Sequence, residues 1–177
     1  MGVDLGALVV DVPDFPQPGV TFKDITPLLA SPEGLAATVA GLVRAAPHGI
    51  DVVVGMEARG FLFAVPVALA LGVGFVPVRK PGKLPRPSVS VTYQLEYGTE
   101  TLTMHVDALR PGARVLVVDD VLATGGTVVA TAGLVEQLGA TVAHVAVVIE
   151  LDFLDGRALL ARHGLHEVSA LTSSGAA

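Results

Sequence analysis

The stretch from Val115 to Thr127 holds the residues best suited to chemistry. Two adjacent carboxylates follow an apolar run and precede a turn of small residues, in the order Val-Leu-Val-Val-Asp-Asp-Val-Leu-Ala-Thr-Gly-Gly-Thr. Glycines let a backbone approach a ligand closely, and free N–H groups at a helix start favour phosphate. The carboxylates are acceptors suited to ribose hydroxyls. We therefore predict a site for a phosphorylated sugar, formed by Asp119, Asp120, Ala123, Thr124, Gly125, Gly126 and Thr127.

Two common nucleotide-binding loops do not match. A Walker A loop requires Gly-x-x-x-x-Gly-Lys-Ser/Thr; Gly55 and Gly60 have the spacing, but Phe61 occupies the Lys position. The Gly-x-Gly-x-x-Gly dinucleotide fingerprint does not occur either. The alternative to a ligand site is an acidic turn with a glycine-rich helix cap. That alternative explains the glycines, but not two carboxylates at a strand end together with two threonines.

A second candidate site is basic. Four of the eleven Lys and Arg residues fall close together, in a chain whose net charge is −6: Arg79, Lys80, Lys83 and Arg86. They follow the end of a predicted buried strand, where α/β proteins place their ligands. We therefore expect an anion-binding segment here, with a solvated loop as the alternative.

Composition excludes several classes of function. The absence of Cys excludes disulfides and a thiol nucleophile, and the five His residues lack metal-ligand spacing. The negative net charge argues against nucleic acid as a partner. The uncharged stretch 61–78 is interrupted by Pro66 and Gly72, so we expect a buried helix and strand rather than a membrane span. The start of the chain is not cationic, and we expect a cytoplasmic protein without membrane contact.

The elements that must position these residues alternate after residue 50. This alternation predicts an α/β fold, a mostly parallel sheet with helices on both faces, in a single domain over 1–177. Residues 79–106 (the flap) are rich in Gly and Pro and then alternate polar with apolar, which favours a hairpin or mobile flap. Residues 172–177 are expected to be a frayed tail. The expected strands are Asp51–Val54, Val73–Val78, Arg114–Val118, Thr141–Ile149 and His166–Leu171; the expected helices are Pro32–Ala46, Phe61–Leu71, Gly125–Leu138 and Leu154–His163.

The chain resembles a known enzyme family. Val117 to Thr127 is similar to the phosphoribosyl pyrophosphate motif of the type I phosphoribosyltransferases. Three further stretches narrow the resemblance to the adenine phosphoribosyltransferases. They are Asp-Phe-Pro-Gln-Pro-Gly-Val-Thr-Phe-Lys-Asp-Ile-Thr at 14–26, Gly-Met-Glu-Ala-Arg-Gly-Phe-Leu-Phe at 55–63, and Val-Arg-Lys-Pro-Gly-Lys-Leu-Pro at 78–85 with Leu-Glu-Tyr-Gly at 95–98.

The resemblance implies transfer of the phosphoribosyl group from phosphoribosyl pyrophosphate to adenine, giving AMP and pyrophosphate. It implies the type I phosphoribosyltransferase fold, a homodimer, and an N-terminal base-binding hood at 1–30. Residues 123–127 would hold the 5′-phosphate, and Asp119 and Asp120 the ribose hydroxyls. The residues facing the pyrophosphate would be Arg59, Lys80 and Lys83, with Arg79 nearby. The adenine pocket would comprise Thr21, Phe22, Lys23 and Tyr97.

The resemblance also places Glu96 and Tyr97 on the closing flap and suggests a cis peptide at Glu57–Ala58. Glu96 would turn inward and, protonated because closure removes its water, donate a hydrogen bond to adenine N7. The cofactor would be Mg²⁺, held mainly by substrate oxygens, because Mg²⁺ keeps its waters and binds phosphate oxygens rather than a protein cage. Pyrophosphate would leave as Mg²⁺, Arg59 and the lysines meet its growing charge.

Two alternatives remain open. A related enzyme would act on hypoxanthine, guanine or xanthine, but residues 14–26 favour adenine. A regulator that binds phosphoribosyl pyrophosphate and controls RNA or DNA would need a helix-turn-helix or a broad basic face, and the sequence contains neither.

Overall fold

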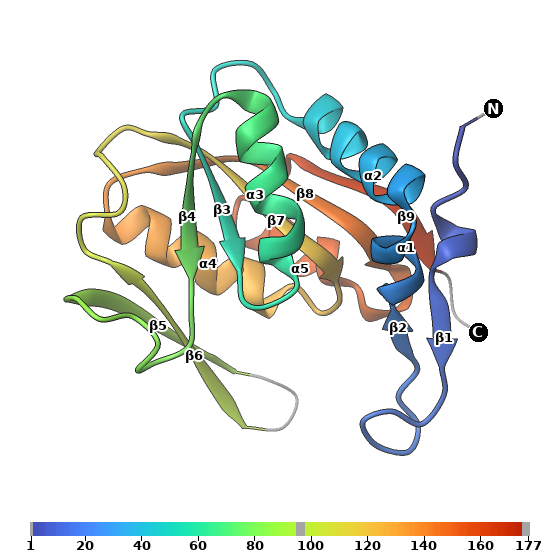
Figure 1. Ribbon diagram of the computed structural model, residues 1–177. Helices are drawn as coiled ribbons and strands as arrows, with labels where there is room; N and C mark the ends of the chain where they lie inside the picture. The colour runs from blue at the N-terminus through green and yellow to red at the C-terminus, as the bar shows by residue number, and fades with distance from the viewer. Residues whose placement is uncertain (1, 95–97, 175–177) are drawn as a thin grey trace.

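The computed structural model describes residues 2–94 and 98–174. Its centre is a parallel five-stranded sheet in the order β4-β3-β7-β8-β9 (Figure 1). The strands are β3 (Val52–Met56), β4 (Gly74–Val78), β7 (Arg114–Leu122), β8 (Thr141–Leu151) and β9 (Val168–Ser174). The predicted fold class is therefore confirmed.

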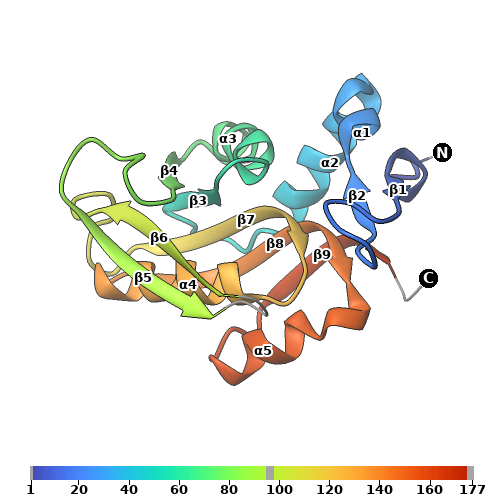
Figure 2. The same cartoon turned by 90° about the horizontal axis from the view of Figure 1, so that it is seen from below.

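Helices cover both faces of this sheet (Figure 2). One face carries α1 (Thr26–Ala30), α2 (Pro32–Ala45) and α3 (Gly60–Leu71), and the other carries α4 (Gly126–Gln137) and α5 (Gly156–Arg162). Leu42 and Phe63 are fully buried on the first face, and Leu134 and Leu160 on the second. Because both faces are buried, the inner strands β3, β7 and β8 are largely apolar rather than alternating.

Local sequence signals account for the helix ends. The Ser31 hydroxyl accepts a 3.0 Å hydrogen bond from the Gly34 N–H, and Pro32 occupies the first helical position of α2. Helix α3 contains Pro66 and ends at Gly72, whose φ of 70° is the left-handed conformation favoured by glycine. In the described part of the chain, no helix is long and apolar enough to cross a membrane.

Two small antiparallel sheets lie beside the central one. In the hood, β1 (Val10–Val12) pairs with β2 (Phe22–Asp24), after a short 3₁₀ turn, η1 (Gly6–Leu8). In the flap, β5 (Ser88–Gln94) pairs with β6 (Thr99–His105). Val91 and Tyr93 of β5 and buried Leu102 and Met104 of β6 pack into the core that contains α4. The base of the flap is thus part of the folded core.

Several predicted strand ends are corrected. β7 does not stop at Val118 but runs to Leu122, because Asp119 pairs with Val147 and Leu122 with Glu150 of β8. Backbone pairing does not require apolar side chains, so the sheet continues through the two aspartates. β9 likewise runs through Ser174, so the tail expected over 172–177 is wrong for 172–174; residues 175–177 lie outside the described residues. A second 3₁₀ turn, η2 (Asp152–Leu154), precedes α5.

Candidate active site

The predicted phosphate-binding turn links β7 to α4 at the carboxyl edge of the sheet. Gly125 caps α4 with a φ of 87°, a left-handed conformation that favours glycine. The first helical hydrogen bond runs from Val129 N–H to Gly125 O, so the amides before it are free of intrahelical acceptors. A cavity of about 60 Å³ lies here, lined by residues that include Asp119, Ala123, Thr124, Gly125 and Thr127. The structure therefore brings the predicted phosphate loop, residues 123–127, together with Asp119.

Gly156, which the sequence analysis did not single out, braces this loop. A Cβ added to Gly156 would lie 2.1 Å from the Ala123 carbonyl oxygen, and one added to Gly125 would lie 2.9 Å from the Gly156 carbonyl oxygen. The first turn of α5 and the phosphate loop are thus in backbone-to-backbone contact. The sequence signal is only a glycine at the start of a weak helix.

The two aspartates have different surroundings. Asp120 Oδ2 lies 2.7 Å from Arg59 Nε, and the Asp120 side chain is only 8% exposed. The geometry there is that of an ion pair rather than a directed hydrogen bond. Asp119 Oδ1 accepts a 2.9 Å hydrogen bond from the Asp120 N–H. Burial, and then the negative charge of Asp120, raise the pKa of Asp119 well above its ordinary value.

Close packing against a glycine contributes to the burial of Asp119. A Cβ on Gly60 would lie 2.7 Å from Asp119 Oδ1. Gly60 begins α3, directly after Arg59. The stretch 55–63, which the sequence analysis quoted for its resemblance, therefore contacts both aspartates.

Arg59 joins the aspartates to the hood. Its guanidinium carbon lies 4.7 Å from the centre of the Phe22 ring, and its Nη1 donates to the Lys23 carbonyl oxygen at 3.3 Å. With Asp120 on its Nε, this one side chain contacts both the predicted base site and the predicted sugar site. The Glu57–Ala58 peptide just before it is cis, as expected.

The basic segment is anchored by Glu57, a residue that the sequence analysis did not assign to the site. Glu57 Oε2 accepts hydrogen bonds from Arg79 Nε at 3.0 Å and Nη2 at 2.9 Å, and its other oxygen accepts from the Lys80 N–H. Burial alone would raise the pKa of Glu57, but these hydrogen bonds hold it below its ordinary value. Arg79 Nη1 also donates to the Lys83 carbonyl at 3.4 Å. Arg86 instead pairs with Asp107, an exposed acid.

A chain of polar contacts connects the basic segment to the phosphate loop through the flap. Lys80 Nζ donates to Glu100 Oε1, and the Tyr93 hydroxyl donates to Glu100 Oε2 at 2.8 Å. The same hydroxyl lies 3.1 Å from Thr127 Oγ1. Burial raises the pKa of Tyr93 to about 12, so this hydroxyl remains a donor. The hydrogen bond from Lys80, followed by that from Tyr93, lowers the pKa of Glu100. The alternation of polar and apolar residues predicted strand β5, but it did not predict that Tyr93 and Glu100 would connect Lys80 to Thr127.

In the hood, Thr21, half-buried, directly precedes β2, and the Phe22 ring meets Phe15 edge to face at 5.2 Å. Lys23 is buried, but its side chain turns towards Asp11, away from the Phe22 side. Its backbone carbonyl accepts the hydrogen bond from Arg59 Nη1. Glu96 and Tyr97, predicted to lie on the flap, fall outside the described residues.

The arrangement of the carboxylates in the candidate site indicates how a metal ion could be bound. Among the described residues, no group of three or more His, Cys, Asp or Glu side chains is arranged to hold a metal ion. Asp120 and Glu57 are paired with arginines. A hard cation that brings its own phosphate oxygens fits this donor set better than one held by a protein cage.

Comparison with known proteins gives concordant matches. The family described as "Phosphoribosyl transferase domain" matches residues 23–165. The adenine phosphoribosyltransferase of Cutibacterium acnes is 63% identical over 167 residues, which cover 94% of this chain and 94% of the relative.

Solved structures agree. That of adenine phosphoribosyltransferase from Thermoanaerobacter pseudethanolicus superposes with a TM-score of 0.92 at 47% identity, covering 96% of this chain and 98% of the other. The Saccharomyces cerevisiae enzyme, complexed with an imino-altritol bisphosphate and adenine, gives a TM-score of 0.86 at 41% identity, covering 94% and 96%.

Proposed function

The chain belongs to the phosphoribosyl transferase family, and we propose that it transfers the phosphoribosyl group of phosphoribosyl pyrophosphate to adenine, giving AMP and pyrophosphate in purine salvage. The names of its relatives support the acceptor base: the Cutibacterium acnes and Thermoanaerobacter pseudethanolicus proteins are adenine phosphoribosyltransferases. The S. cerevisiae relative was solved with adenine bound.

One geometric observation carries the proposal. Arg59 contacts Phe22 of the hood and Asp120 of β7 at the same time. A base stacked at Phe22 and a ribose held at Asp119 and Asp120 would therefore lie side by side. That is the arrangement a transfer from the sugar carbon to a base nitrogen requires.

Each set of site residues binds a different part of phosphoribosyl pyrophosphate, according to the charge of that part. Amides and hydroxyls of the phosphate loop, Ala123, Thr124, Gly125, Gly126 and Thr127, bind the 5′-phosphate. Asp119 and Asp120 accept hydrogen bonds from the ribose hydroxyls. Arg59, Lys80 and Lys83, with Arg79 nearby, neutralise the charge that grows on the departing pyrophosphate.

The base site recognises adenine from the hood and the flap. Phe22 stacks on the ring, and the backbone of Thr21 reads its edge, with the backbone of Lys23 and with Tyr97 completing the pocket. A protonated Glu96 donates a hydrogen bond to N7 as positive charge builds on the attacking base. Closure of the flap excludes water from the cation-like sugar carbon.

Magnesium is the proposed cofactor. When bound to the pyrophosphate oxygens, Mg²⁺ withdraws charge from the leaving group. The pairing of Asp120 and Glu57 with arginines supports a metal carried by substrate. Lys80 and Lys83 would then bind the phosphate oxygens left free by the metal ion.

The experiment that tests the function is pyrophosphate release from phosphoribosyl pyrophosphate and Mg²⁺, with adenine, hypoxanthine, guanine and xanthine added in turn. We expect release with adenine alone, and none after chelation of Mg²⁺. Release with an oxopurine instead would identify the related enzyme, and binding of phosphoribosyl pyrophosphate without release would favour the regulator.

A homodimer is proposed as the working state. Leu62, Val65 and Leu69 lie on one face of α3 and are 46%, 39% and 75% exposed. An apolar groove runs beside them along α2, lined by residues that include Leu35, Val39 and Val43. Replacing Leu69 with Lys should yield monomers in sedimentation experiments, whereas an unaltered dimer would place the interface elsewhere.

The proposed location is the cytoplasm. Phosphoribosyl pyrophosphate carries several negative charges and does not cross a bilayer unaided, because burying charge in hydrocarbon is costly. An enzyme that consumes it must share its compartment. Fractionation of cells that produce the chain would test this proposal.

A further inference from the structure

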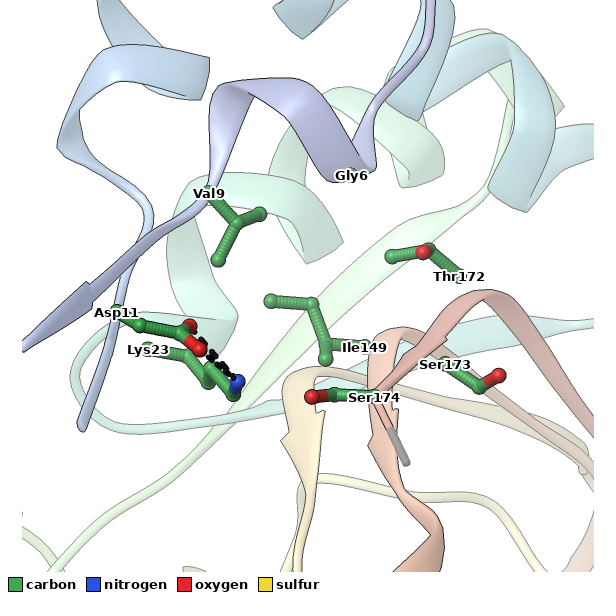
Figure 3. Close-up of a pocket in the computed structure, with 8 residues that line it drawn as sticks. All are labelled: Gly6, Val9, Asp11, Lys23, Ile149, Thr172, Ser173 and Ser174. Carbon is green, nitrogen blue, oxygen red and sulfur yellow. Dashed lines mark hydrogen bonds and ion pairs between the residues drawn. The ribbon is translucent and has the colours of Figure 1, made fainter. Parts of the chain in front are cut away.

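An ion pair joins the two strands of the hood, on the face opposite Phe22. Both carboxylate oxygens of Asp11 accept from Lys23 Nζ, at 2.7 and 2.8 Å (Figure 3). The two residues are directly opposite each other in the β1–β2 pairing. Beside them is a cavity of about 240 Å³, which reaches Ile149 of β8 and Thr172 of β9. Packing therefore leaves space around the ammonium group, and Asp11 fixes its position.

The burial of the two partners is unequal. The Lys23 side chain is 9% exposed, whereas that of Asp11 is 51% exposed. A buried ammonium without a partner is costly, because it has lost its water and gained no compensating charge. Loss of Asp11 would therefore be expected to drive Lys23 out of this position rather than leave it there unpaired.

Movement of Lys23 would be transmitted to the base site. Side chains alternate along β2, so Phe22 and Lys23 point to opposite faces of the same short strand. The Lys23 carbonyl accepts a hydrogen bond from Arg59 Nη1, and the Phe22 ring lies against the same guanidinium. The strand that carries the Asp11–Lys23 pair is thus the strand that sets Phe22 and Arg59 relative to each other.

We propose that Asp11 is a positioning residue for the base site, which acts through Lys23 to hold β2 and hence Phe22 and Arg59 in register. The inference rests on the proposed function. It assigns Asp11, a residue of β1 that the sequence did not mark as part of the site, a part in recognition of the base. The phosphate loop, residues 123–127, lies on other elements, and Arg59 keeps its ion pair with Asp120, so binding of phosphoribosyl pyrophosphate should be unaffected.

The test uses steady-state kinetics of the full chain. Asp11→Asn should raise KM for adenine roughly tenfold, the scale of a lost hydrogen bond to a charged group, with KM for phosphoribosyl pyrophosphate unchanged. Asp11→Glu should restore most of the loss. The matched control is Asp4→Asn, because Asp4 accepts only local hydrogen bonds from Gly6 and Ala7 among the described residues; both constants should be unchanged.

A double variant keeps the proposal falsifiable if Asp11→Asn folds poorly. Asp11→Asn combined with Lys23→Met removes both charges, so its KM for adenine should be closer to the original than that of Asp11→Asn alone. An unchanged KM for adenine in Asp11→Asn, or equal rises in the single and double variants, would overturn the inference. Failure of the proposed function is distinct: the unaltered chain would then release no pyrophosphate with adenine.

Discussion

The Arg59 guanidinium lies over the Phe22 ring, with 4.7 Å from its central carbon to the ring centre, while its Nε lies 2.7 Å from Asp120 Oδ2. The three residues come from the hood, from the start of α3 and from the carboxyl end of β7. A single planar cation therefore occupies the junction of the proposed base site and the proposed sugar site. Arginine suits this position because it stacks on rings and pairs with carboxylates at the same time.

Replacing Arg59 with Ala should lower kcat by roughly two to three decades, the usual cost of removing a donor that meets transition-state charge. Lys at this position should recover only part of the rate, because an ammonium lacks the planar fork. Arg110→Ala is the matched control, since Arg110 pairs with Asp51 next to the amino end of β3. Steady-state rates that are equal for Arg59→Ala and the unaltered chain would refute the assignment.

Asp119 should make stability depend on pH in an unusual direction. Its raised pKa means that the folded chain holds this proton at pH values where the unfolded chain has released it. The free energy of unfolding should therefore fall as pH rises from about 4 towards the raised pKa. Asp119→Asn should remove this fall and raise Tm at pH 7.5.

The same variant should lose roughly tenfold or more in kcat/KM for phosphoribosyl pyrophosphate, since the Asn amide nitrogen donates where a carboxyl oxygen can accept a hydrogen bond from a ribose hydroxyl. Thermal unfolding between pH 4 and 8 checks the stability effect. Asp107→Asn is the control, because Arg86 lowers the pKa of this exposed acid. A pH dependence that persists unchanged in Asp119→Asn would assign the buried proton to another group.

Gly156→Ala should damage the phosphate loop without touching the substrate. The new Cβ would meet the Ala123 carbonyl at 2.1 Å, so the loop or α5 must shift. We expect a loss of about 1–3 kcal/mol in stability, as for other overpacked sites, and a higher KM for phosphoribosyl pyrophosphate. In Gly74→Ala, where a Cβ meets nothing within 4 Å, both should be nearly unchanged. Equal behaviour of the two variants would show that the contact does not brace the loop.

The flap should exchange hydrogen in two different ways. Amides of Leu102–Met104 should be protected with and without AMP, because this part of β6 is buried in the core. Peptides covering residues 82–94 should slow sharply when AMP or substrates bind, as expected of a segment that closes over them. Mass-spectrometric exchange measures both. Equal exchange of 82–94 in the two states would mean that this segment is not a lid.

Glu96 remains a prediction from the sequence and its resemblance. Replacing it with Leu should cost about 10²–10⁴ in kcat, the range for a positioned acid, with little change in affinity for phosphoribosyl pyrophosphate. Gln should cost less, because its amide can still donate to N7. Near-full activity in both variants would make Glu96 a surface residue. Gln137→Ala, on the exposed side of α4, serves as a control.

The sequence by itself determined the local arrangement of the proposed phosphate loop and the fold class. The loop is formed by one contiguous segment, in which the end of a strand, two carboxylates, two glycines and the start of a helix follow one another. The order of residues therefore suffices to bring its hydrogen-bonding groups together. The fold class followed from alternating apolar strands and helices, because elements buried on both faces must be continuous apolar runs. The hairpin in the flap could be predicted from a different local pattern, the strict alternation of polar and apolar residues along β5.

Only the tertiary structure decided which distant side chains meet. Arg59 with Phe22, Lys80 with Glu100 and Gly156 with Ala123 join different elements, and spacing along the chain does not determine the distance between them. The tertiary structure also decided where the strands end. β7 continues through Asp119 and Asp120 because β8 offers it backbone partners as far as Glu150. Lys23 shows most clearly what the sequence could not predict. Its neighbours in sequence suggest that its side chain lies in the base pocket, but the alternation of side chains along β2 directs it to Asp11 instead.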